Sequence, residues 1–457
     1  MKVFLAVFIC KILYFIGTRI GRGSSLPGKI VLKLFPEVLR QLKLPEIIIA
    51  ITGSNGKTTT TELIVHALKA SGKSVGWNHE GSNQTEGIAT LLLRESSLSG
   101  KVKCDAIVME CDERYAKKIF ENVKPTALLV TNLCRDQLTR NGHPEFIEDC
   151  IRSAITTAGN GMQLVLNTDD PYVSTLARQG DGDISSLGLF GTQRVKNSAV
   201  LWFGVCQGDG GLTTPGMYDD GAFCPVCKER MTYSYRIAGH YGNYNCSACG
   251  FKRNEPDVAV SIKEDAFLSF GNDIEMKVKR PGITNAYNFC AAVATVKAVG
   301  VSISDSVNAL NEYDFTSGRV SALPTSGSDD LLLLSKHENS FAYDCSLTWI
   351  IEQKKPCTVI IMVNAISRKY YTSETSWLWD IDFDLLADEN VKCIVLAGRY
   401  VNELAARFAM SKVEWSKITL VDDLDTLSES IDINSVGCLY AVTCFSDKVK
   451  LLKALGK

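Results

Sequence analysis

A glycine-rich turn followed by lysine and threonine gives the clearest chemical signal in this chain. Residues 50–60 read AITGSNGKTTT and continue an apolar run. Glycines in such a turn let backbone N–H groups close around phosphate oxygens, and the start of the following helix adds a favourable dipole. The expected phosphate-binding residues are Gly53, Ser54, Asn55, Gly56, Lys57, Thr58 and Thr59.

Two side chains of this turn have separate expected roles. The Lys57 ammonium would neutralise the outer phosphates of a nucleotide, and the Thr58 hydroxyl would reach a Mg²⁺ ion. The spacing is Gly-x-x-Gly-Lys-Thr, because the longer Walker form needs a glycine where Ile51 stands. An ordinary glycine turn before a helix is the competing interpretation, and the Lys-Thr pair after a clean strand argues against it.

Carboxylates at the end of another predicted strand could complete a metal site. Residues 109–113 read MECDE, and the run at 132–138 ends the next predicted strand in a similar way. Open α/β sheets bind ligands beyond the carboxyl ends of their strands, and Mg²⁺ prefers oxygen ligands. Glu110 is therefore the candidate magnesium ligand together with Thr58. Solvated surface charge is an equally good interpretation of Glu110 from the sequence alone.

Four cysteines form two Cys-x-x-Cys pairs with 18 residues between the pairs. They are Cys224, Cys227, Cys246 and Cys249. Two such pairs can surround one tetrahedral Zn²⁺ through four thiolates, which leaves no open position, so we expect a structural zinc site. A redox role for one pair is the alternative, and the presence of a second pair argues against it.

The elements that must position these residues alternate between apolar strands and helices. This rhythm predicts an α/β protein with a parallel sheet covered by helices on both faces, followed by a second, smaller α/β domain. The predicted strands are 47–51, 105–109, 127–131 and 163–166, then 358–363, 393–397, 418–421 and 438–442. Helical patterns cover 62–68 and 286–300, and residues 182–222, rich in Gly, Ser and Asp, interrupt the rhythm.

The predicted domains are a helical segment at 1–45, a central domain at 46–322 with a cysteine insert at about 222–252, and a C-terminal domain at 323–457. The length of 457 residues allows about three domains. A net charge of −2 gives no sign of nucleic-acid binding. Most of the 16 cysteines stand singly in apolar runs, which favours reduced thiols and a cytoplasmic location.

The first 20 residues are apolar but carry Lys2, Lys11 and Arg19. A secretory signal has an uninterrupted apolar core and a small-residue cleavage site, and a spanning helix needs about 20 nearly uncharged residues. We therefore expect an amphipathic helix, which either packs on the body of the protein or touches the inner membrane surface. The packed arrangement is the favoured one.

The phosphate loop resembles that of the Mur ligases, which build the stem peptides of peptidoglycan. The whole chain more closely resembles the MurT family, the ligase-like subunits of lipid II isoglutaminyl synthase, as a divergent member. The matching motifs are LPGK at 26–29, NLxRDQL at 132–138, LNxDDP at 166–171, the four-cysteine ribbon, PGxxNxYN at 281–288, GR at 318–319 and SWLWDxDF at 376–383.

This resemblance implies a Mur ligase-type central ATPase domain with an inserted zinc ribbon, and a Rossmann-like C-terminal domain. It implies an ATP-dependent carbon–nitrogen ligase with Mg²⁺, and Zn²⁺ in a structural role. The reaction would amidate the α-carboxylate of D-glutamate in lipid II, through an acyl phosphate, to D-isoglutamine for cell-wall synthesis. The ammonia would come from a class I glutaminase of the GatD type bound as a heterodimer.

The resemblance also assigns roles to individual residues. Lys57, Thr58 and Glu110 correspond to phosphate and magnesium positions. The remaining assignments are Asn285 and Asn288 in the segment that contacts adenine, Arg319 near the phosphates, and Asn83 and Gln84 on the substrate side.

The chain departs from the MurT pattern at two places. The family's Asp-Gly-Arg-Asp-Val run reads YTSET at 371–375, so Glu374 stands where an aspartate is thought to complete the glutaminase triad, with Asp380 as the fallback. The family's Lys-Asn-Pro-Ala-Gly run reads KHENS at 336–340. We interpret both changes as lying where the domain meets the glutaminase, with the ATP site untouched. A Mur-type ligase that uses another amine, and a non-catalytic regulatory paralogue, stay open as alternatives.

Overall fold

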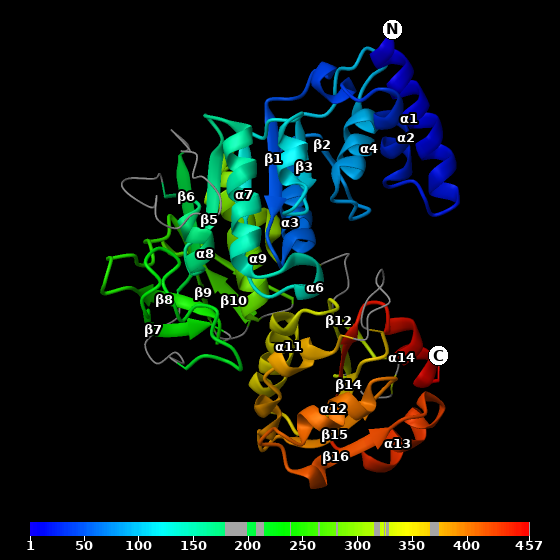
Figure 1. Cartoon of the computed structure of the whole chain (residues 1–457), viewed down its shortest axis with the longest axis vertical. Helices are drawn as coiled ribbons and strands as arrows, with labels where there is room; N and C mark the ends of the chain where they lie inside the picture. The colour runs from blue at the N-terminus through cyan, green and yellow to red at the C-terminus, as the bar shows by residue number, and fades with distance from the viewer. Residues whose placement is uncertain are drawn as a thin grey trace.

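The computed structural model describes residues 1–178, 199–206, 214–237, 239–263, 266–279, 282–314, 320–323, 325, 329–365 and 374–456. Two α/β bodies lie one beyond the other along the long axis of the molecule (Figure 1). The N-terminal helices lie at one end, and the C-terminal body lies at the other.

A nine-stranded sheet forms the centre of the larger body. Its strands, in spatial order, are β11 (Glu275–Lys277), β10 (Phe267–Ser269), β9 (Val258–Ile262), β6 (Val200–Val205), β5 (Gln163–Asn167), β4 (Ala127–Val130), β1 (Ile47–Thr52), β3 (Ala106–Glu110) and β2 (Val75–Trp77). The pairs from β2 to β9 are parallel, and β10 and β11 add antiparallel pairs.

Helices cover both faces of this sheet, as the sequence predicts. They are α3 (Lys57–Ala70), α4 (Thr85–Glu95), α5 (Ala116–Phe120), α6 (Leu138–Asn141), α7 (Pro144–Ala158), α8 (Pro171–Thr175), α9 (Ile283–Ala298) and α10 (Ile303–Leu310). Residues of the strands alternate between two buried apolar clusters. Ile48 and Ala50 pack with α4 and α7 in one cluster, and Ile49 and Ile51 pack with α3 and α9 in the other.

Three further elements, α1 (Lys2–Arg19), α2 (Leu26–Leu34) and the 3₁₀ helix η1 (Val38–Gln41), precede the sheet. They pack beside α4 at the β2 edge (Figure 1). Gly28 permits this packing, because a Cβ at Gly28 would lie 2.0 Å from the carbonyl oxygen of Glu86. The Gly28 amide donates a hydrogen bond of 2.9 Å to Thr90 Oγ1.

The cysteine insert contains the hairpin of β7 (Thr232–Ile237) and β8 (Tyr241–Asn245). Strand β6 lies inside the stretch 182–222 that the sequence predicts as a break in the rhythm. That prediction missed a strand in the middle of the sheet. Its six residues, VLWFGV, are flanked by polar, glycine-rich sequence that hides a short apolar segment.

The C-terminal body has a six-stranded sheet. Its order is β12 (Val320–Ala322), β13 (Leu331–Ser335), β17 (Cys438–Cys444), β14 (Cys357–Met362), β15 (Val391–Ala397) and β16 (Ile418–Val421), with only the β12–β13 pair antiparallel among these strands. The accompanying helices are α11 (Ser340–Glu352), η3 (Ser376–Asp380), η4 (Phe383–Ala387), α12 (Val401–Phe408), η5 (Trp415–Lys417), η6 (Leu424–Thr426), α13 (Leu427–Asn434) and α14 (Lys448–Ala454). This sheet begins at Val320, three residues before the boundary expected from the sequence.

Candidate functional site

The phosphate loop lies between the end of β1 and the start of α3. Two glycines of this loop adopt positive φ angles, 123° at Gly53 and 83° at Gly56. A Cβ at Gly53 would lie 2.3 Å from Thr131 Oγ1, and one at Gly56 would lie 2.4 Å from Asn288 Oδ1. Both conformation and space therefore require glycine here, and the loop can wrap closely around a ligand.

The Lys57 side chain is buried and turns back over this loop. Its ammonium contacts the carbonyl oxygen of Gly53 and forms an ion pair of 2.5 Å with Glu113 Oε1. Burial favours the neutral amine, but the carboxylates of Glu113, Glu110 and Asp136 outweigh it and raise the pKa of Lys57. Lys57 is therefore a fixed positive charge inside the loop.

Glu113 is a member of this site that the sequence analysis did not single out. The same oxygen that pairs with Lys57 accepts a hydrogen bond of 3.1 Å from the backbone N–H of Gly53. A carboxylate therefore engages two of the groups expected to bind phosphate. The MECDE run was the available signal, but its spacing alone does not show which of its carboxylates turns into the loop.

Glu110 ends β3 directly beside β1, where Ile51 is its partner in the sheet. The Thr58 hydroxyl donates a hydrogen bond of 2.8 Å to Glu110 Oε2, and the Asn83 amide donates one of 3.2 Å to Oε1. The structure thus brings Thr58, Glu110 and Asn83 together, while Gln84 forms the N-cap of α4. Paired hydroxyl and carboxylate oxygens suit a Mg²⁺ ion.

The C-terminal body reaches the phosphate loop through the residues that follow β13. Lys336 Nζ donates a hydrogen bond of 2.7 Å to the carbonyl oxygen of Ser54. Asn339 Nδ2 donates to Asn55 Oδ1 at 3.0 Å and to Asp136 Oδ1 at 2.8 Å. The interpretation that the altered run at 336–340 leaves this loop untouched is therefore wrong. Strand β13 ends at Ser335 facing the loop, which the linear sequence does not reveal.

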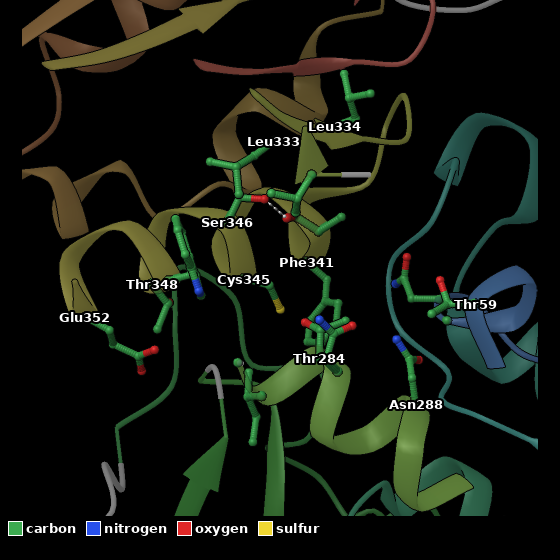
Figure 2. A pocket seen from close by; sticks show the side chains of 18 of the residues that line it. Thr59, Thr284, Asn288, Leu333, Leu334, Phe341, Cys345, Ser346, Thr348 and Glu352 are labelled. Carbon is green, nitrogen blue, oxygen red and sulfur yellow. Dashed lines mark hydrogen bonds between the residues drawn. The ribbon is translucent and has the colours of Figure 1, made fainter. Parts of the chain in front are cut away.

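A cavity of about 370 Å³ lies next to the loop, between the two bodies (Figure 2). Its walls are the first turns of α9, with Asn285 and Asn288, and one face of α11. Apolar walls come from Leu333, Leu334, Phe341 and Trp349. Gly56 and Thr59 form its boundary toward the loop. The volume is in the range of small-molecule pockets.

Glu352 is a further residue of this cavity that sequence reasoning missed. It ends α11 and lines the cavity (Figure 2). Trp349 lines the same cavity. Burial raises the pKa of its carboxyl group. Asn288 connects the cavity to the first turn of α3, because its Oδ1 accepts a hydrogen bond of 3.2 Å from the Thr60 hydroxyl.

Arg135 joins three parts of the molecule. Its guanidinium donates to both carboxylate oxygens of Asp220, at 2.7 and 2.8 Å, and to Asp380 Oδ1 at 2.8 Å. It also lies over the ring of Tyr218, 4.1 Å from the centroid. Burial disfavours the charged guanidinium, but the carboxylates of Asp220 and Asp380 outweigh this effect and raise the pKa of Arg135. Asp380 is therefore engaged within the chain.

Glu374 does not join the phosphate loop. Its carboxylate is exposed and accepts a hydrogen bond of 2.8 Å from the backbone N–H of Ser376, at the start of η3. Hydrogen bonding with the Ser376 side chain, and then with its backbone N–H, lowers the pKa of Glu374. Arg319 and residues 371–373 lie outside the described residues, so the structure does not place them.

The four cysteines of the insert converge on one point. Their sulfur atoms all lie within 4.8 Å of one another. Two of the separations are 3.6 Å, between Cys224 and Cys249, and 3.5 Å, between Cys227 and Cys246. A tetrahedral zinc site with Zn–S bonds of about 2.3 Å has edges of roughly 3.8 Å. The cluster therefore fits a possible metal site of the zinc type.

Comparison with protein families identifies two regions. Residues 51–251 match the Mur ligase middle domain, and residues 336–446 match the MurT ligase C-terminal domain. The chain is 27% identical over 461 residues to the lipid II isoglutaminyl synthase subunit MurT of Staphylococcus aureus strain N315, covering all of this chain and 98% of that protein. The Streptococcus pneumoniae R6 counterpart is 27% identical over 467 residues, covering all of this chain and 97% of that protein.

Solved structures show the same fold. A pseudomurein peptide ligase type C from Methanothermus fervidus aligns with a TM-score of 0.66 at 20% identity, over 93% of this chain and 84% of that one. MurF ligase from Thermotoga maritima in complex with ADP aligns with a TM-score of 0.58 at 15% identity, over 93% and 83%. In sequence the chain is similar over its full length to these MurT subunits, and in fold it is similar to the Mur-type ligases.

Proposed function

We propose that this protein is the ATP-using subunit of an enzyme that amidates the D-glutamate α-carboxylate of lipid II to D-isoglutamine in peptidoglycan synthesis. The full-length likeness to proteins named lipid II isoglutaminyl synthase subunit MurT supports this reaction. The observation that carries the proposal is the convergence of Lys57, Thr58 and Glu110 beside a cavity bounded by the MurT-type C-terminal region.

ATP would bind across the boundary between the two bodies. The loop from Gly53 to Thr58 offers backbone N–H groups and the Lys57 ammonium to the phosphates. The cavity of about 370 Å³ would take the adenosine, with Asn285 and Asn288 at its edge. From the family resemblance we also propose that Arg319 provides a second cation near the phosphates.

Thr58 and Glu110 would hold a Mg²⁺ ion, because their oxygens lie side by side at the loop. When bound, this ion would offset negative charge on the phosphates of ATP. The chain's own contribution is the fixed Lys57 charge, which acts in a buried setting where electrostatic interactions are strong.

The substrate carboxylate is a poor electrophile, so it must first acquire a good leaving group. A carboxylate oxygen of the substrate attacks the γ-phosphorus of ATP, the bond to the β,γ-bridging oxygen breaks, and ADP leaves. Ammonia then attacks the carbonyl carbon of the acyl phosphate, phosphate leaves, and the nitrogen loses one proton to give the amide. Lys57 faces the charge that develops during phosphoryl transfer, and Glu113 would release Lys57 when phosphate binds.

A class I glutaminase of the GatD type would supply the ammonia as the partner in a heterodimer. Glu374 is the candidate carboxylate for its triad, because it is exposed on the C-terminal body, whereas Asp380 pairs with Arg135. Both proteins would work in the cytoplasm at the inner face of the membrane, where lipid II is reached.

The zinc site would be structural and hold the insert in shape. The insert also contacts the C-terminal body, because His240 Nε2 lies 3.2 Å from Asp344 Oδ2 on α11. A correctly folded insert thus helps to place the wall of the nucleotide cavity.

The test is reconstitution with the cognate glutaminase and lipid II. We expect amidated lipid II, detected by mass spectrometry, only when ATP and glutamine are both present. Lys57→Ala should abolish product, while Lys69→Ala, an exposed lysine in the last turn of the same helix, should leave activity unchanged. Product made from another amine without a glutaminase would instead identify an amine ligase. ATP turnover that survives Lys57→Ala would refute the site.

A further inference from the structure

Helix α1 exposes a continuous apolar stripe. Phe15, Phe4 and Phe8 are 61%, 50% and 46% exposed. With three neighbours they form what we call the outer face of α1: Phe4, Leu5, Phe8, Ile12, Phe15 and Ile16. These positions recur at spacings of three and four residues, so the side chains lie on one side of the helix. Isolated exposed apolar residues are ordinary, whereas contiguous apolar patches mark interaction sites.

The opposite side of α1 is already used. Ala6, Val7 and Cys10 are fully buried in the apolar cluster that also contains residues of α2 and α4. A helix that is apolar on every side is normally covered on every side. Here the described residues of the protein cover only one side, which leaves the outer face open to a partner.

The charge around this helix indicates the chemistry of that partner. Residues 1–36 contain no Asp or Glu, although the whole chain has a net charge of −2. Their basic residues are Lys2, Lys11, Arg19, Arg22, Lys29 and Lys33. Arg19 lies over the ring of Phe15, 3.5 Å from its centroid, which places a cation at the edge of the apolar stripe. Exposed apolar side chains can enter the headgroup boundary of a bilayer, and neighbouring basic residues are attracted to anionic lipids.

We propose that the outer face of α1 lies on the surface of an anionic phospholipid bilayer. The phenylalanine rings would enter the boundary between headgroups and acyl chains, to a depth of about 5–10 Å for helices of this kind. The basic residues would contact lipid phosphates, while the buried side of α1 stays on the protein. In the part of the chain that the structure describes, no helix is both long and apolar enough to cross a bilayer.

A short loop connects this face to the magnesium-binding residues. Glu80 accepts a hydrogen bond of 2.8 Å from the Tyr14 hydroxyl of α1, and the Ser82 hydroxyl donates one of 2.9 Å to Ser25 before α2. The next residue, Asn83, contacts Glu110. This link would hold the magnesium-binding residues at a fixed height above the membrane. That role rests on the proposed function, in which the substrate is lipid-linked. The proposal that α1 binds the membrane does not depend on the proposed function.

The test is flotation of the full-length protein, without nucleotide, with vesicles of phosphatidylglycerol and phosphatidylethanolamine or of phosphatidylcholine alone. We expect the protein to float with the anionic vesicles and to be released by high salt. The triple variant Phe4→Ser, Phe8→Ser, Phe15→Ser should bind at least tenfold less. Arg19→Gln should weaken binding to the anionic vesicles selectively.

Ile433→Ser with Val449→Ser is the matched control. These apolar residues are 73% and 74% exposed on α13 and α14, in the body farthest from α1 (Figure 1), and their loss should not alter flotation. Equal flotation of the triple variant and the parent protein, or no flotation of the parent, would overturn the proposal. A dimer that becomes monomeric in the triple variant, measured by light scattering, would assign the face to a second copy instead. None of these readouts uses ATP, so each is independent of the proposed reaction.

Discussion

Glu113 should compete with nucleotide phosphate for the groups of the loop, and the variant Glu113→Gln tests this directly. Glu113 Oε1 lies 2.5 Å from Lys57 Nζ and 3.1 Å from the backbone nitrogen of Gly53. Phosphate must take over both groups and would arrive next to a negative carboxylate. The glutamine variant keeps the size and one acceptor oxygen but removes the charge.

The expected gain can be estimated from the charges. Two unit charges about 4 Å apart interact with about 4 kcal/mol at an effective dielectric constant of about 20. Removing the charge of Glu113 recovers only part of this energy, because Glu110 and Asp136 still surround Lys57 and solvent enters the open loop. About 1.4–2.8 kcal/mol should remain, which corresponds to roughly 10–100-fold tighter binding of ATP.

Isothermal titration calorimetry with a non-hydrolysable ATP analogue measures this change. Without nucleotide, Glu113→Gln should melt at a lower temperature, because the buried Lys57 ammonium loses its closest partner. With nucleotide the difference should shrink, since tighter binding adds more stabilisation. Glu121→Gln, an exposed glutamate at the end of α5, is the control. Unchanged or weaker ATP binding by Glu113→Gln would show that Glu113 does not compete with phosphate.

Three further predictions concern other parts of the molecule. Purified protein should contain one Zn²⁺ per chain by elemental analysis, and Cys246→Ser should lose it together with thermal stability; a zinc-free protein with freely titratable thiols would contradict this. Glu374→Gln should lower glutamine hydrolysis by the complex at least about 10-fold, or roughly 1.4 kcal/mol of barrier, with Asp380→Asn as the comparison; if neither variant changes it, this chain does not complete the triad. Burial raises the pKa of Asp170 from 3.8 to about 7. The folded state therefore holds a proton that the unfolded state releases, and this stability is lost as the pH rises toward 7. Relative to Asp170→Asn, the free energy of unfolding should fall by up to about 1.4 kcal/mol per pH unit between pH 4 and 7 and then level off; parallel pH profiles would argue against this.

The local sequence pattern was sufficient to predict much of the fold. The predicted strand at 47–51 is β1 (Ile47–Thr52), and the one at 438–442 is β17 (Cys438–Cys444). Buried parallel strands are continuous apolar runs, and their period differs clearly from that of the flanking helices. Strands β10 and β11 have three residues each, which is too short for such a pattern to be distinct from a loop.

The site could not be predicted in full from the sequence, because several of its contacts join segments that are distant in the chain. The loop motif indicated Lys57 and Thr58 because strand, turn and helix are contiguous in the sequence. Asn339 contacts Asn55, which is 284 residues away, and Arg135 pairs with Asp380, which is 245 residues away. Such partners depend on how two sheets are placed relative to each other, and a short polar run in a single sequence carries no signal of that placement.

The proposed binding of nucleotide would therefore be linked to the position of the C-terminal body. Hydrogen bonds from Lys336 and Asn339 connect that body to Ser54 and Asn55 of the phosphate loop. The same body supplies α11 as one wall of the adjacent cavity. A nucleotide that contacts both bodies would stabilise their docked arrangement. By linkage, a partner that favours the docked arrangement would strengthen nucleotide binding by the same factor by which nucleotide strengthens the binding of that partner. A glutaminase that binds the C-terminal body and favours docking would thus raise ATP affinity without touching the phosphate loop.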